Sequence, residues 1–168
     1  MTQVRPADNQ QAPIIIDVEA SGFGSGSYPI EIGLAMPANE RHCFLIRPAE
    51  HWRHWSEEAE KIHKISRQAL HEHGLEIQDV AYQLNEILAG LTVYSDAWSH
   101  DSSWVYKLFD EAEIYPKFKI ETLRKLLTEK QLSLWDATRE KIEQEQQTIR
   151  HRASADAHVL QLTFLRTQ

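Results

Sequence analysis

The sequence predicts a three-layer α/β domain in which helices cover both sides of a mixed, five-stranded sheet. Three observations support this prediction. An apolar strand lies near the start of the chain, and two short connections after it imply an antiparallel meander. From residue 56 onward, helical patterns alternate with short apolar strands, which favours a mixed sheet. We expect the first strand to be central.

The first half of the chain predicts the meander. The polar segment 1–12 is expected to be a flexible tail, and residues 13–168 a single domain. The first strand lies in the apolar stretch 13–22, and the glycine-serine loop at 21–27 lets backbone approach a ligand closely. The other expected elements of this half are a strand at 29–36, a turn at 37–40 and a strand at 42–47.

The second half predicts helices separated by short strands. Ser56 is expected to cap a helix, because an acidic first turn follows it. A second helical pattern fills 78–88 and stops at Gly90, and a third begins after a buried strand at 91–95. The apolar face of this third helix is Trp104, Val105, Leu108 and Phe109. The last expected elements are a strand at 117–120 and helices at 121–127, 134–147 (capped by Ser133) and about 152–165.

Composition and charge restrict the possible functions. A net charge of −7 excludes general adhesion to nucleic-acid backbone, which needs clustered Lys and Arg, so any nucleic acid must be held locally. No run approaches the roughly 20 apolar residues of a membrane span, and the start lacks a signal peptide, so we expect a cytoplasmic protein without membrane contact. The single cysteine, Cys43, excludes an internal disulfide and is expected to be a small buried hydrophobe.

Asp17 and Glu19 are the first candidate catalytic residues. Alternate residues of a strand share one face, so the two carboxylates lie side by side, on a face that we expect Ile14 and Ile16 to bury. Two adjacent buried carboxylates repel each other unless a cation lies between them. A hard divalent metal such as Mg²⁺ or Mn²⁺ is the simplest partner. The alternative is a strand end whose acids face solvent.

A third carboxylate follows the buried strand at 91–95. Asp101 opens the helix that carries Trp104, and this position suits a carboxylate aimed at the first strand. Asp96 competes with Asp101 for the same role. The structural alternative for Asp101 is an N-terminal helix residue that only stabilises the helix.

His151 and Asp156 complete the candidate catalytic set. The histidine lies just before the last expected helix, and the aspartate lies more than one turn inside it, beside apolar residues. A carboxylate near a core-facing surface favours a nearby cation. A histidine beside it is a base that titrates near neutral pH. The alternative is a pair of surface residues without a shared role.

In their order and spacing, these residues resemble the DEDDh exonucleases, the family that contains ribonuclease T, oligoribonuclease and the proofreading subunits of bacterial replicative polymerases. The resemblance covers about residues 13–165. Further similar segments are Glu31-Ile32-Gly33, the stretch 59–66, which is similar to the family's Val-His-Gly-Ile segment, and Asp101-Ser102-Ser103-Trp104-Val105. The chain departs from the family pattern at Asp96-Ala97, at His100 and at Lys64, which stands where the family has glycine.

The resemblance implies a ribonuclease H-like fold and a 3′–5′ exonuclease that releases nucleoside 5′-monophosphates. It implies that Asp17, Glu19 and Asp156 bind one divalent cation, Mg²⁺ or Mn²⁺. Asp17 would also contact a second cation, and Asp101 would act through bound water. Two such cations stabilise both oxygens of an in-line phosphoryl displacement. His151 is implied to take a proton from the attacking water.

The resemblance also implies substrate contacts. Phe23 is expected to wedge against the terminal base, His63 to approach the terminal phosphate and His100 to stack on a base; core packing or solvent exposure is the alternative for each. The full expected set is Ala20, Ser21, Phe23, His63, His100 and Trp104. A local basic patch is expected from Arg47, Arg53, Lys61, Lys64 and Arg67, although a charged helix surface explains these residues equally well.

The expected substrate is the 3′ end of single-stranded DNA or RNA, because aromatic residues near the site suit stacking of unpaired bases. Two other classes remain: an exonuclease-like module that binds nucleic acid without catalysis, and a metal-dependent hydrolase of other phosphoesters. We expect no polymerase partner, since the chain ends about a dozen residues after Asp156. Trp52 and Trp55 either cover a sheet edge of their own chain or form a homodimer interface, which we favour.

Overall fold

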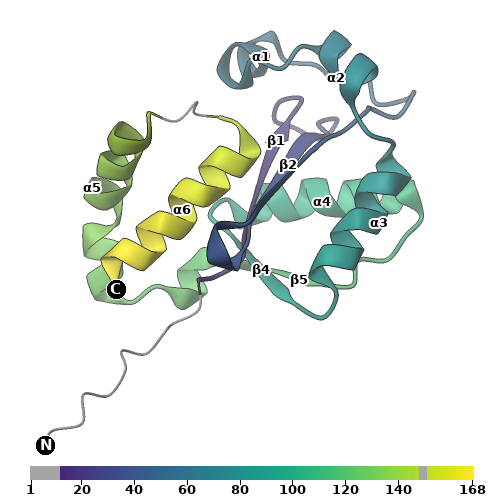
Figure 1. Cartoon of the computed structure of the whole chain (residues 1–168). Coiled ribbons are helices and arrows are strands. Elements are labelled where there is room, and N and C mark those ends of the chain that lie inside the picture. Colours follow the sequence, from purple (N-terminus) through teal and green to yellow (C-terminus); the bar gives the residue numbers. More distant parts are fainter. Residues whose placement is uncertain (1–11, 148–150) are drawn as a thin grey trace, which may run out of the picture.

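The computed structural model describes residues 12–147 and 151–168, so the predicted tail at 1–12 lies almost entirely outside the described residues. The described part forms a five-stranded sheet with helices on both sides (Figure 1). The strand order is β3-β2-β1-β4-β5, which confirms that the first strand is central. The strands are β1 Ile15–Ala20, β2 Pro29–Ala35, β3 Arg41–Leu45, β4 Thr92–Ser95 and β5 Lys119–Thr122.

The sheet is mixed, as the sequence predicts. β1, β2 and β3 form an antiparallel meander, whereas β1 pairs with β4, and β4 with β5, in parallel. Parallel strands need a crossover connection, and helices supply it both between β3 and β4 and between β4 and β5. Because β1 and β4 run in the same direction, their carboxyl ends lie at the same edge of the sheet.

The two faces of β1 belong to different cores. Ile16 points into the larger core, and Ile15 points to the opposite side, into a smaller cluster formed with the last helix. Asp17 and Glu19 share the face of Ile15, because alternate residues of a strand share one face. The expectation that Ile14 and Ile16 bury the carboxylate face was therefore wrong by one residue. The carboxylates face the last helix.

The described residues form six α-helices. Figure 1 shows α3 and α4 on one side of the sheet, α5 and α6 on the other, and α1 and α2 beyond one end of β1 and β2. In the described parts of the chain, no helix combines the length and apolar character that crossing a bilayer requires. The helices are α1 Glu57–His63, α2 Arg67–His73, α3 Ile77–Leu88, α4 Trp98–Ala112, α5 Glu129–Gln146 and α6 Ala153–Thr167.

Serine caps begin the two short helices. Ser56 caps α1 as predicted, because its Oγ accepts a hydrogen bond from the backbone N–H of Ala59 at 3.2 Å. α2 begins in the same way, with Ser66 accepting from the N–H of Ala69 at 3.1 Å. The sequence pattern does not predict α2, because its seven residues show only about two turns of a helix.

Two other helix predictions need correction. α5 begins at Glu129 rather than residue 134, because Thr128 and Gln131 form a capping box ahead of it. Ser133 lies inside this helix and donates its hydroxyl to a backbone carbonyl instead of capping. The predicted helix at 121–127 is wrong: its first two residues complete β5, and the next four form a 3-10 helix.

Three side chains lie differently from the expectation. Cys43 is exposed on β3, because the next residue of the strand takes the buried face. Trp52 is only 4% exposed and stacks on Tyr28 with ring centroids 5.2 Å apart. Trp55 is partly buried and donates its indole N–H to Glu60 at 2.7 Å. Both tryptophans therefore pack within their own chain and give no support to a dimer interface; a homodimer stays a prediction.

Candidate active site

A pocket of about 520 Å³ lies at the sheet edge where the carboxyl ends of β1 and β4 meet. Its lining combines carboxylates, histidines, aromatic rings and one face of α1. The five candidate catalytic residues all line it: Asp17, Glu19, Asp101, His151 and Asp156. The fold thus brings together residues from three distant segments of the chain.

Asp101 and Asp156 occupy equivalent places in two different helices. Each is the fourth residue of its helix, α4 or α6. We expected Asp156 to lie more than one turn inside the last helix. It lies in the first turn instead, because α6 begins only at Ala153. The positive end of the helix dipole favours a carboxylate in the first turn, so both helices direct their stabilising end toward an acid of the site.

Of the two aspartates that follow β4, Asp101 is the one that lines the pocket. Its side chain is only 2% exposed and accepts a hydrogen bond from Ser95 Oγ at 2.6 Å. Asp96 is exposed and forms an ion pair with Arg139 of α5 at 3.1 Å. Asp96 acts on the site only through its charge, which contributes to the raised pKa values of the pocket acids.

The carboxylates oppose one another's ionisation. Burial, followed by the charges of Asp101 and Glu19, holds the pKa of Asp17 well above its usual range. Burial and the charge of Asp156 raise the pKa of Glu19 to about 8. Burial also raises the pKa of Asp101 to about 7, although the hydrogen bond from Ser95 opposes this rise. A positive charge bound among these carboxylates would therefore stabilise their ionised forms.

The donor set fits a divalent cation. One ligand atom each from Glu19, His151 and Asp156 all lie within 4.8 Å of one another. Carboxylate oxygens and an imidazole nitrogen are donors that divalent metals accept. Asp17 lies in the same pocket but outside this cluster of three, whereas His151, which the sequence analysis expected only as a base, lies within it.

Glu31 of β2 fixes the start of α6. Its carboxylate is fully buried and accepts hydrogen bonds from Nε and Nη2 of Arg152, the latter at 2.7 Å. It also accepts from the backbone N–H of Ala153 at 2.8 Å. Arg152 makes no side-chain cap of its own, so a neighbouring strand supplies the cap of this helix. Glu31 is the register partner of Glu19, which places the histidine and aspartate of α6 opposite β1.

The backbone around this start is closely packed. Gly33 faces α6, and a Cβ at this position would overlap the backbone of Ala153 and Ser154. His151 adopts a left-handed conformation with φ of 61°, and its N–H donates to Asp156 Oδ1 at 3.3 Å. The close approach of β2 to α6 thus determines how far Asp156 extends into the pocket.

Three rings form an aromatic wall of the pocket. Phe23 is 72% exposed, and its ring meets His100 edge-on with centroids 5.2 Å apart. His100 stacks on Trp104 at 5.6 Å. Trp104 is held in place because its indole N–H donates to Ser27 Oγ at 2.9 Å. The three expected stacking residues therefore lie together, beside the acids.

His63 and Ala20 also line the pocket, whereas Ser21 does not. The N–H of Ile65 donates to His63 Nδ1 at 3.0 Å, so the proton of the neutral ring is on Nε2. This Nε2 is buried and has no hydrogen-bond partner among the described residues, and burial lowers the pKa of the ring. Ser21 is fully buried and bonds to His54 Nδ1 at 2.9 Å, so its expected substrate contact is corrected to a structural one.

One wall of the pocket, on α1, was not predicted from the sequence. Glu58, Ala59 and Ile62 line it together with His63, and Ile62 is 53% exposed. The spacing of these four residues places them on one face of a helix. The sequence carries no clear signal for this wall, because the exposure of Ile62 becomes visible only once the position of α1 is known.

The residues of the expected basic patch do not form one surface. Arg47 pairs with Glu76, and Arg67 donates to the backbone carbonyls of residues 52 and 53. Lys61 and Lys64 instead line a second pocket on the other side of α1.

Residues 14–164 match the sequence model of an exonuclease family, RNase T. No curated protein sequence matches the chain. Among similar solved structures, E. coli exonuclease I with a dA16 oligonucleotide has a TM-score of 0.69 at 14% identity, covering 94% of this chain and 41% of that chain. The zinc-bound complex of E. coli exonuclease I with single-stranded DNA has a TM-score of 0.69 at 14% identity, covering 92% of this chain and 40% of that chain.

Exonuclease I from Methylocaldum szegediense has a TM-score of 0.65 at 16% identity, covering 92% of this chain and 40% of that chain. The chain thus spans about two fifths of the length of these proteins. At such identities the likeness shows the fold, and it confirms the predicted three-layer arrangement.

Proposed function

Because the chain belongs to the RNase T family of exonucleases and has its ribonuclease H-like fold, we propose that it is a metal-dependent 3′–5′ exonuclease. It would act on single-stranded nucleic acid and release nucleoside 5′-monophosphates. The observation that carries the proposal is the convergence of four carboxylates, a histidine and an aromatic wall in one pocket. Phosphodiester hydrolysis needs charge stabilisation at the phosphate and a base for the water, and this pocket has groups suited to both.

The acids are proposed to hold the metal. Asp17, Glu19 and Asp156 would bind one divalent cation, Asp17 would contribute to a second, and Asp101 would act through bound water. The raised pKa values support this assignment, because cations would offset the mutual repulsion of the carboxylates. Mg²⁺ or Mn²⁺, when bound as a pair, would stabilise the entering and leaving oxygens of an in-line displacement.

His151 is proposed as the general base. It is exposed beside the start of α6, and one of its ring nitrogens lies near carboxylate oxygens of Glu19 and Asp156. A neutral imidazole has a basic ring nitrogen, so it can accept a proton from the attacking water and release it to solvent. Its backbone hydrogen bond to Asp156 keeps the base beside the acids.

The aromatic wall is proposed to hold the terminal base. Stacking of a base on an aromatic ring is worth about 1–3 kcal/mol and does not depend on sequence. His63 is proposed to approach the terminal phosphate, because it lines the pocket and its neutral ring carries the proton on Nε2. Of the two E. coli exonuclease I structures, one contains single-stranded DNA and the other a dA16 oligonucleotide, which supports a single-stranded substrate here.

A time course with end-labelled strands tests this function. The chain is incubated with single-stranded DNA, single-stranded RNA and blunt duplex of one sequence, with Mg²⁺ or Mn²⁺ and separately with excess chelator. We expect shortening from the 3′ end of at least one single strand, and only with metal. Faster loss of the blunt duplex than of either single strand would contradict the assignment to single strands. Undiminished hydrolysis in chelator would contradict the metal mechanism.

Two variants of α4 provide a matched pair. Asp101→Asn removes a carboxylate from the pocket, and Asp110→Asn removes an exposed one from the same helix, outside the pocket. We expect the first to lower the rate by about 10- to 100-fold, the range for residues that support a metal indirectly. The second should stay within about twofold of the unsubstituted chain. Equal rates in both variants would place the third acid elsewhere.

Two further measurements, of binding and of the turnover of small phosphodiesters, separate the two other classes. Binding of divalent cations and oligonucleotide without turnover would indicate a silent binding module. Turnover of small phosphodiesters alone would indicate a hydrolase of other phosphoesters. The full set of acids and the histidine in one pocket favours the exonuclease over both.

A further inference from the structure

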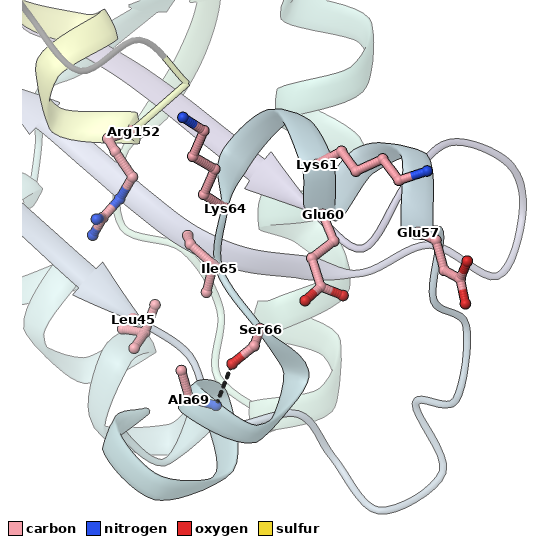
Figure 2. Close-up of a pocket in the computed structure, with 9 residues that line it drawn as sticks. All are labelled: Leu45, Glu57, Glu60, Lys61, Lys64, Ile65, Ser66, Ala69 and Arg152. Atoms are coloured by element: carbon pink, nitrogen blue, oxygen red, sulfur yellow. Dashed lines mark hydrogen bonds between the residues drawn. The ribbon is translucent and has the colours of Figure 1, made fainter.

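A second pocket, of about 660 Å³, lies beside the candidate active site, and no step of the proposed reaction uses it (Figure 2). It is formed by α1, the start of α2, the end of β3 and the residue before α6. Figure 2 shows Lys64 and Arg152 on one side of this pocket, and Glu57 and Lys61 on the other. The pocket is therefore charged unevenly.

Helix α1 is the wall between the two pockets. Residues 57, 60, 61 and 64 line the second pocket, whereas residues 58, 59, 62 and 63 line the catalytic one. Each set follows the spacing of one helix face. An α-helix with its side chains is about 10–12 Å across, so a strand that leaves the catalytic pocket reaches the second pocket within a few nucleotides.

Two pairs of consecutive residues join the pockets. His63 lines the catalytic pocket and Lys64 the second one, and His151 and Arg152 do the same at the start of α6. We call these two pairs the seam. Lys64 ends α1 in a left-handed conformation with φ of 58°, which glycine adopts more readily than any residue with a Cβ. A lysine at a position that suits glycine indicates that its side chain has a function.

The seam and the far end of the second pocket differ in charge. Lys64 forms no ion pair with any residue that the structure describes. Arg152 donates Nε and Nη2 to Glu31, which fixes its guanidinium at the seam. At the far end, Glu60 is engaged by a tryptophan indole, and Glu57 is exposed in the first turn of α1. Positive charge thus lies where the pockets meet.

We propose that Lys64, with Arg152 beside it, binds a backbone phosphate of the substrate strand, a few nucleotides to the 5′ side of the scissile bond. This inference rests on the proposed exonuclease function, because it requires the 3′ end to occupy the catalytic pocket. An ammonium group binds phosphate as a point charge, and a fixed guanidinium adds a directed donor. Such a local site lets a chain of net charge −7 hold a strand without a basic surface.

The dependence of the rate on strand length tests the proposal. The measured quantity is the ratio of kcat/KM for an octanucleotide to kcat/KM for a dinucleotide, which has no phosphate beyond the scissile one. Lys64→Ala should lower this ratio by about three- to tenfold, through the KM of the octanucleotide, as expected for one lost phosphate contact. Lys130→Ala removes an exposed charge at the start of α5 that lines neither pocket, and should change the ratio less than twofold.

Lys61→Ala tests the assignment to the seam, because Lys61 lies at the far end of the same pocket. It should lower the ratio less than Lys64→Ala does. Equal losses in the two variants, or an unchanged ratio in Lys64→Ala, would overturn the proposal.

The salt dependence of binding separates this proposal from the proposed function. A fluorescent octanucleotide is titrated at several salt concentrations with the Asp17→Asn protein, which should not degrade it, and with Asp17→Asn combined with Lys64→Ala. Loss of one contact should reduce the slope of log K against log salt by about 0.7 for a single strand. An unchanged slope would overturn the contact. Failure of the unsubstituted chain to hydrolyse either strand would refute only the exonuclease function.

Discussion

Glu19 allows a quantitative test of the acid cluster. Glu19→Gln keeps the shape of the side chain on β1 but removes its ionisation. In the metal-free protein, burial and the charges of Asp156 and Glu31 raise the pKa of Glu19 from 4.5 to about 8. The unfolded chain therefore releases this proton near pH 4.5, and the folded chain releases it near pH 8. Stability present at low pH is consequently lost as the pH rises through this interval.

The magnitude follows from linkage. Each pH unit over which the unfolded chain is ionised and the folded chain is not lowers the free energy of unfolding by about 1.4 kcal/mol. The interval sets an upper limit of about 5 kcal/mol, and the partial exposure of the carboxylate reduces the expected loss to about 2–4 kcal/mol. The free energy of unfolding of Glu19→Gln relative to the unsubstituted chain should rise by this amount between pH 5 and pH 8. Comparing the two proteins cancels groups whose pKa does not depend on Glu19, including His63 and His158, whose lowered pKa values act in the opposite direction. Asp17 does not cancel: the charge of Glu19 raises its pKa, so its titration changes in the same direction as that of Glu19 and adds to the difference.

The assay is urea unfolding of both proteins at several pH values from 5 to 8, first with chelator and then with Mg²⁺. Glu86→Gln, at an exposed position of α3, is the matched control and should follow the unsubstituted chain. Added Mg²⁺ should restore the stability lost at high pH, because the cation binds the ionised form. A stability difference between Glu19→Gln and the unsubstituted chain that stays constant from pH 5 to pH 8 would refute this reasoning.

Two further predictions concern the start of α6. His151→Ala should lower the rate by roughly 10²–10⁴-fold, with cation binding retained in calorimetry; lost cation binding would identify His151 as a ligand instead. Gly33→Ala should destabilise the protein by more than about 2 kcal/mol in urea unfolding, because the new Cβ overlaps the backbone of α6. Gly26→Ala, whose Cβ would meet only ordinary contacts, is its control, and equal stability of the two variants would contradict the close approach.

The acids of the site could be predicted because their chemistry is local in sequence. Asp17 and Glu19 alternate on one strand, and Asp156 follows His151 at a fixed spacing. The assignment of Ile14 and Ile16 to the carboxylate face was wrong for a local reason, because positions 14 and 16 alternate with 17 and 19 and therefore lie on the opposite face of β1. The partner of the carboxylate face is not local in sequence, because α6 supplies it. The wall on α1 was missed because a short helix shows its exposed face only once its position is known.

Helix boundaries and side-chain burial show the same limit. Most of α5 is exposed, so it lacks the apolar period that marks a helix, and its start is visible only in the capping box at Thr128. Trp52 lies in a polar segment, which suggested exposure. Its burial depends on Tyr28, which is 24 positions earlier in the chain and comes near only through the packing of the sheet.

The cap that Glu31 provides for α6 has a consequence for the order of folding. Glu19 and Asp156 are more than 130 residues apart in the chain, so a chain whose sheet has formed without α6 holds only part of the acid cluster. Docking of α6 joins the buried carboxylate of β2 to the start of the helix and, in the same event, delivers the last acid and the histidine. We therefore expect the proposed exonuclease activity to arise in one step with the final tertiary assembly, so that incompletely folded chains would not hydrolyse nucleic acid.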